Sequence, residues 1–112
     1  MIKKLLFSFI VAFMGMQAQA QVPANDLCDD AIVVNCGDVV TGNTDMSTNA
    51  TSPEDGCGTP NGAAGNWYSV AGNGDIINLS LCSLPGYDTK IRVYSGNCFS
   101  LACVGGNDDS CG

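Results

Sequence analysis

The chain has 112 residues, a formal net charge of −7, no histidine and seven cysteines. The acidic balance argues against nucleic acid and anionic membrane surfaces as partners. The lack of histidine excludes Ser–His and Cys–His nucleophiles, and the cysteines are better explained as disulfides, so we predict that the chain is not an enzyme.

Residues 1–20 are typical of a secretory signal peptide. Two lysines precede an apolar run over residues 5–16, and Ala18-Gln19-Ala20 supplies the small residues of a cleavage site. The apolar run is shorter than the roughly 20 residues that cross a bilayer, which argues against a membrane anchor. We therefore predict a secreted or cell-surface protein, not inserted in the membrane after cleavage, with a mature chain over residues 21–112.

The mature chain keeps only Lys90 and Arg92 as basic residues, against eleven acidic ones. Its length allows one small domain, and a domain of this size gains from covalent cross-links because its core is modest.

Short runs of alternating polarity, separated by Gly, Asn and Pro, follow one another along this segment. We expect a long loop over residues 42–61 and strands over residues 31–34, 39–41, 66–70, 75–82, 88–94 and 101–104. No sustained helical period follows the signal peptide. This organisation predicts an all-β sandwich.

The last two expected strands form a hairpin around a turn at Ser95-Gly96-Asn97. Strand alternation sends Thr89, Ile91 and Val93 to one face. The opposite face then carries Asp88, Lys90, Arg92 and Tyr94. Gly105-Gly106 is expected to release the backbone from the hairpin into the acidic run that follows.

All seven cysteines follow the signal peptide, and in an exported chain they predict disulfides. We expect two local pairs, each bracketing a short loop or hairpin, and one longer bridge: Cys28 with Cys36, Cys98 with Cys103, and Cys82 with Cys111. Cys57 is then left over. An intermolecular bridge, a free thiol and a partner beyond this sequence all stay open for it.

An acidic group is the best candidate site. Asp88 begins one strand of the expected hairpin, and Asn107, Asp108 and Asp109 follow the other strand. If the two ends converge, these side chains offer the oxygen ligands that Ca²⁺ prefers, and Ca²⁺ is the one cofactor that the sequence suggests. The alternative is that Asp88 caps a turn while the later acids are solvated.

Aromatic side chains are the candidates for contact with a macromolecular ligand. Trp67 and Tyr68 fall on opposite faces of their strand, so one of them is expected to be core. Trp67, Tyr87 and Tyr94 are the side chains that would contact an extracellular polysaccharide or protein.

A family resemblance rests on two groups of residues. The first group is Asp88-Thr89-x-Ile91-x-Val93-Tyr94-x-Gly96, followed by Leu101 and Asn107-Asp108-Asp109. This group resembles the core signature of bacterial pre-peptidase C-terminal domains. The second group lies upstream and consists of Pro23-Ala24-Asn25-Asp26-x-Cys28, Cys36-Gly37, Cys57-Gly58-Thr59 and Trp67-Tyr68. This group resembles a cysteine-containing branch of such modules in exported bacterial proteins. The resemblance implies a jelly-roll-like β-sandwich that acts as a non-catalytic accessory module of a secreted or surface protein.

The resemblance is incomplete at its C-terminal end. Domains of this kind continue with further strands after the N-D-D segment, so we expect residues 21–112 to be a partial domain that lacks its last strands. Neighbouring domains of a longer chain would then be its partners. The alternative function is an extracellular glycan- or protein-binding module, or an adhesion module, with calcium as a potential requirement.

Overall fold

The computed structural model describes residues 19–48, 56–60, 64–82 and 88–109. Regular structure in these residues consists of β-strands and short 3-10 turns, without an α-helix. The predicted β-rich class is confirmed at this level. The predicted signal peptide lies almost wholly outside the described residues. Within the described ranges, no helix is long and apolar enough to span a bilayer.

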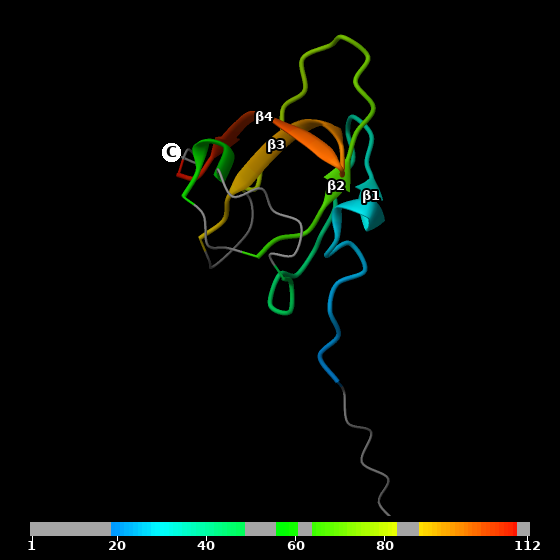
Figure 1. Ribbon diagram of the computed structural model, residues 1–112, viewed down its shortest axis with the longest axis vertical. Helices are drawn as coiled ribbons and strands as arrows, with labels where there is room; N and C mark the ends of the chain where they lie inside the picture. Colours follow the sequence, from blue (N-terminus) through cyan, green and yellow to red (C-terminus); the bar gives the residue numbers. More distant parts are fainter. Residues whose placement is uncertain (1–18, 49–55, 61–63, 83–87, 110–112) are drawn as a thin grey trace, which may run out of the picture.

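The largest element is a hairpin (Figure 1). Strand β3 (Ile91–Asn97) pairs antiparallel with β4 (Ser100–Asn107), and Cys98-Phe99 forms the turn. The pairing passes from Val93 opposite Gly105 to Tyr94 opposite Cys103, so Val104 is an extra, bulged residue of β4.

The predicted hairpin was out of place by several residues. Its expected turn, Ser95-Gly96-Asn97, belongs to β3, and Gly105-Gly106 lies inside β4 rather than after it. The Phe99 N–H donates to Asn97 Oδ1 at 3.0 Å, which stabilises the turn beyond Asn97. Gly96 lies within the strand with φ 106°, a conformation that favours glycine. A side chain at this position would clash with the Ser100 carbonyl oxygen.

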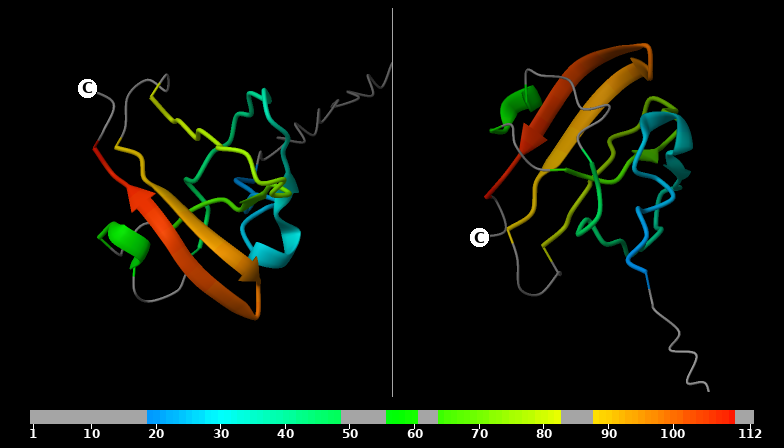
Figure 2. Two further views of the ribbon diagram at one scale, coloured as in Figure 1. Left: turned by 90° about the horizontal axis from the view of Figure 1, so that it is seen from above. Right: turned by 60° about the horizontal axis from the view of Figure 1, so that its bottom comes forward.

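A second, smaller sheet lies beside the hairpin (Figure 2). Strand β1 (Ile32–Val33) pairs parallel with β2 (Tyr68–Ser69). Ile32 N–H donates to Trp67 O, and Val34 N–H donates to Ser69 O. The strands expected over 31–34 and 66–70 are therefore present in shortened form. Those expected over 39–41 and 75–82 were wrong: the two segments join no sheet in the described part of the chain.

The segment before β1 is held by buried polar side chains. Asn25 Nδ2 donates to Trp67 O at 2.9 Å, and Trp67 N–H donates back to Asn25 O at 2.8 Å. Asp26 accepts a hydrogen bond of 2.7 Å from the Thr48 hydroxyl. Asn25 and Asp26 are both buried, so these bonds replace the water that the two side chains lose. The segment at Asn25 and Asp26 is thus a structural anchor for β2.

Two disulfides join remote parts of the chain, Cys28 to Cys98 and Cys57 to Cys103, across 70 and 46 residues. Both predicted local pairs were wrong, Cys36 is an exposed free thiol, and the supposed leftover, Cys57, is cross-linked. Cys98 sits in the hairpin turn while Cys103 faces Tyr94, so these two residues are not cross-strand partners. Cys82 is also disulfide-bonded. Its predicted partner, Cys111, lies outside the described residues.

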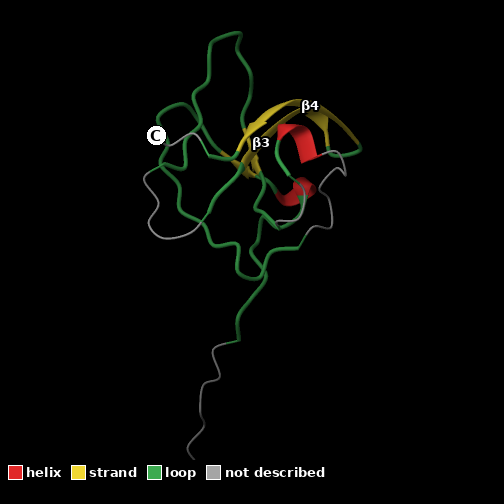
Figure 3. Ribbon diagram, turned by 90° about the vertical axis from the view of Figure 1, so that its left-hand side faces the viewer, coloured by secondary structure: helices red, strands yellow, loops and turns green. Residues whose placement is uncertain are grey.

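The turn that carries Cys57 packs directly on the hairpin. This 3-10 turn, η2 (Gly56–Gly58), contacts both β3 and β4, and Figure 3 shows the hairpin curving over the short 3-10 turns. A Cβ on Gly106 would lie 2.3 Å from the Cys57 carbonyl oxygen. The hairpin backbone therefore meets the turn without an intervening side chain. Arg92 reinforces the contact, because its Nε donates to Thr59 Oγ1 at 2.8 Å and its Nη2 to Pro60 O at 2.9 Å.

The buried interior is small. Among the described residues, the buried apolar side chains are those of Cys28, in the first 3-10 turn η1 (Cys28–Asp30), and Cys57. Large apolar side chains remain exposed at several places, such as Val39 at 94%, Phe99 at 92% and Ile76 at 90%. The described residues form two sheets of two strands each, and the jelly-roll-like sandwich stays a prediction.

Candidate functional site

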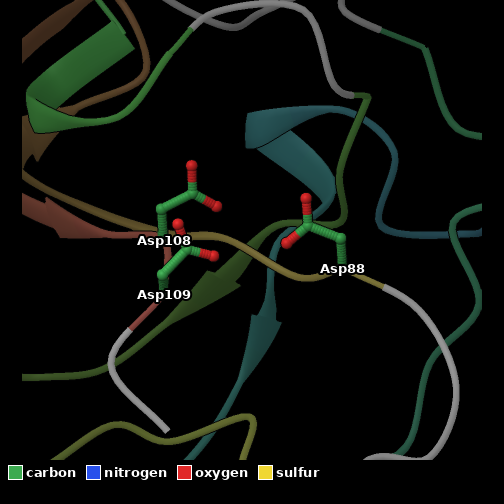
Figure 4. A group of neighbouring side chains, drawn as sticks. All are labelled: Asp88, Asp108 and Asp109. Carbon is green, nitrogen blue, oxygen red and sulfur yellow. The ribbon is translucent and has the colours of Figure 1, made fainter. Parts of the chain in front are cut away.

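The acidic residues at the open end of the hairpin converge as predicted. Asp88 precedes β3, and Asp108 and Asp109 follow β4, so the antiparallel pairing brings them to the same end. One carboxylate oxygen from each lies within 4.8 Å of the other two, and Figure 4 shows the three side chains gathered from both sides of the hairpin. We call Asp88, Asp108 and Asp109 the acidic cluster.

The charge of this cluster is partly neutralised within the protein. Lys90 Nζ lies 3.0 Å from Asp108 Oδ2, and both side chains are 22% exposed. A partly exposed ion pair of this kind contributes modestly to stability, but it places an ammonium group beside one carboxylate of the cluster. A cation that bound all three carboxylates would have to compete with Lys90.

One oxygen of the cluster has no hydrogen-bond partner in the described part of the chain. This oxygen, Asp108 Oδ1, is shielded from solvent. Asp88 and Asp109 are exposed. A hard cation with six to eight oxygen ligands would therefore take three carboxylates here and fill the rest of its coordination with water or further oxygens.

Asn107, the fourth predicted ligand, lies beside the acidic cluster. Together with Asp108 it borders a small cavity of about 120 Å³ between the hairpin and residues 79–82. Apolar side chains form much of the wall, including Leu79, Leu81 and Ile91. The cavity is large enough for a few water molecules.

The predicted aromatic contacts lie differently from the expectation. The rings of Trp67 and Tyr94 face each other with centroids 5.9 Å apart and an interplanar angle of 34°. The pair links the β2 region to the hairpin, and both residues are half-buried, whereas Tyr68 is exposed. Each ring of the pair therefore has the other packed on one side. Tyr87 lies outside the described residues.

Sequence reasoning missed the contacts that position the hairpin end. Arg92 and Thr59 meet from segments more than thirty residues apart, and nothing in their local sequence indicates the pairing. The Cys57-Gly58-Thr59 motif was a usable signal. Its cysteine follows Gly56 and therefore lies between two glycines, which indicates a sharp turn close to other backbone. Cys57 indeed adopts a left-handed conformation with φ 44°.

Comparison with known proteins gives no relative for this chain. No protein-family model, no curated protein and no solved structure matches it.

Proposed function

We propose that this chain is a non-catalytic accessory module of a secreted or cell-surface protein, attached to a larger protein. The observation that carries the proposal is the mismatch between its small buried interior and its exposed apolar side chains. Apolar surface that a domain leaves uncovered is commonly covered by another polypeptide. The two long-range disulfides add support, because such cross-links are typical of proteins in oxidising compartments.

Attachment is tested on the native protein in the exported fraction of the source cells. An antibody against residues 64–82 should detect, on a reducing gel, a polypeptide well above the 11.5 kDa of this chain. A single band at or below that mass would show that the module stands alone.

The accessory role is tested by deleting residues 21–109 in frame from that longer protein. We expect a lower yield of soluble exported protein. The kcat of each correctly folded molecule should be unchanged, because the module supports its neighbour without touching substrate. Full yield combined with lost turnover would place chemistry in the module and overturn the proposal.

The second candidate is a calcium-dependent binding module for an extracellular glycan or protein. The convergence of the three carboxylates, with one shielded Asp108 oxygen left unpaired, favours it. Calorimetric titration of the exported, oxidised protein with Ca²⁺ should give binding that is lost in Asp88→Asn/Asp109→Asn. The matched control is Asp29→Asn/Asp30→Asn, which removes two charges from exposed positions in η1 and should bind as the parent does. Equal heats from all three proteins would leave the acidic cluster as solvated charge.

A further inference from the structure

Among the described residues, the buried apolar side chains are cysteines and not aliphatic residues. Cys28 and Cys57 are 7% and 2% exposed, whereas Val33 at 70% and Val104 at 65% exemplify the described aliphatic residues that remain in contact with water. Burial of apolar surface is ordinarily the main favourable term in folding. Where so little of it is buried, the cross-links carry an unusual share of what holds the parts together.

The strands and 3-10 turns of the described residues form two units, and the elements of one unit have few contacts with those of the other. One unit contains η1 and the β1–β2 sheet, and the other contains the β3–β4 hairpin with η2. No strand pairing joins the two sheets, and η2 contacts both strands of the hairpin. The Cys57–Cys103 disulfide lies inside the hairpin unit, where the Cys57 sulfur is 3.3 Å from the Val93 carbonyl oxygen.

Among the described residues, a disulfide and a ring contact join the two units. Cys28 lies in η1, immediately before β1, and Cys98 lies in the hairpin turn, so their disulfide bridges the two units. Trp67 precedes β2 and packs on Tyr94 of β3. Trp67 is the single tryptophan of the chain, so its spectroscopic signal reports on this contact.

We propose that docking of the two units is controlled by oxidation: the Cys28–Cys98 disulfide holds the β1–β2 unit on the hairpin, and its reduction releases that unit. The reductant is a dithiol. One of its thiolates attacks the Sγ of Cys98, the less buried of the two residues, breaking the S–S bond and expelling Cys28 as a thiolate. The second thiol then attacks the mixed disulfide, frees Cys98 and closes the oxidised ring of the reductant. Two electrons pass to the cysteines, and the two protons lost by the dithiol end on their thiols.

The consequence is a chain that completes its fold only in an oxidising compartment. Before oxidation the hairpin unit forms from local pairing, and the β1–β2 unit remains undocked. The fold is then completed only after the chain has left the reducing cytoplasm, because docking requires the Cys28–Cys98 disulfide.

The test compares two double variants of the exported protein, Cys28→Ser/Cys98→Ser and Cys57→Ser/Cys103→Ser. In the first, we expect the near-ultraviolet circular dichroism of Trp67 to be lost and its fluorescence maximum to move close to that of the urea-unfolded protein. Slow amide exchange in β3 and β4 should persist, because Cys57–Cys103 and Arg92 still hold the hairpin. The second variant should keep the Trp67 signals.

A reductant provides the independent measurement. Dithiothreitol should remove the Trp67 signals from the parent protein, and reoxidation should restore them. Cys36→Ser removes the exposed free thiol and should behave as the parent in every assay. An unchanged Trp67 signal in the Cys28→Ser/Cys98→Ser variant would overturn the proposal. Loss of hairpin exchange protection together with the Trp67 signal would also overturn it, because the units would then unfold as one.

Discussion

At the scale of single residues, Gly106 shows how closely the hairpin and the Cys57 turn approach. Its missing side chain allows the Cys57 carbonyl oxygen and the Thr59 methyl group to meet the β4 backbone. Gly105, the next residue along the strand, has open space where its Cβ would stand. Two adjacent glycines therefore have different roles, and only one of them is required by packing.

Replacing Gly106 with alanine should lower the free energy of unfolding by about 2 kcal/mol, because the added methyl group overpacks the contact with Cys57 and Thr59. The measurement is urea denaturation of the oxidised protein. Gly105→Ala is the matched control and should change the free energy of unfolding far less. Equal effects of the two substitutions would show that the close approach at Gly106 is not maintained in solution.

The sequence allowed part of this residue-level picture to be predicted. Convergence of the acidic cluster followed from the hairpin, because antiparallel pairing returns residues 108 and 109 to the end where residue 88 lies. The Lys90–Asp108 ion pair and the Arg92–Thr59 bond depend on the exact register and on a turn placed far away in sequence. Local patterns carry no information on either.

At the scale of elements, β4 is an edge strand with little to protect it. Within the described chain it pairs only with β3, and residues 100–107 include no charged side chain and no proline. Edge strands of natural proteins are commonly protected by lysine, proline or bulges, because unpaired backbone groups recruit other strands. The bulge at Val104 is the one such device in β4.

Val104→Lys should therefore reduce self-association of the oxidised protein, since a charge at the edge disfavours pairing with another strand. The measurement is sedimentation velocity over a range of concentrations. Val39→Lys adds the same charge at a fully exposed position outside the sheets and serves as the control. If both variants shift the sedimentation profile alike, the effect belongs to net charge and not to the edge of β4.

Strand positions illustrate why elements were easier to predict than their ends. Alternation located the hairpin, and an apolar run located the strand near residue 32, because both patterns are typical of strands. Alternation misplaced the turn, since Gly96 satisfies a strand with φ 106° as readily as it satisfies a turn. Residues 75–82 alternate equally well, yet in the described structure no neighbour pairs with them, and alternation alone does not supply a partner strand.

At the scale of the whole molecule, the disulfides join remote parts of the chain, and proximity in sequence was the wrong guide to their pairing. We predicted that Cys28 pairs with Cys36 and Cys98 with Cys103, because each pair brackets a short loop or hairpin. Loop-closure entropy does make short loops easier to close, but the hairpin register and the Cys57 turn place other sulfurs in contact. Pairing across 46 and 70 residues is a property of the folded arrangement.

Protease cleavage before aspartate residues distinguishes the long-range disulfide pairing from the predicted local pairing. In the long-range pattern, peptide 88–107 should be recovered before reduction as one species joined to peptides 26–28 and 55–74. The local pattern would release 88–107 alone and would join 26–28 to 30–37. The measurement is mass spectrometry at acidic pH after alkylation, which prevents exchange through Cys36.

The Cys28–Cys98 bridge also determines how this protein would bear a mechanical load. Tension applied between residue 20 and residue 107 passes from Cys28 straight to Cys98, so the intervening chain carries none of it. At about 3.4 Å for each extended residue, the two disulfides together withhold roughly 240 Å of contour length from a pulling force, because Cys57–Cys103 closes 46 residues of the same span. The oxidised protein is therefore a short tether between the two points, and reduction of both disulfides converts it into a long one.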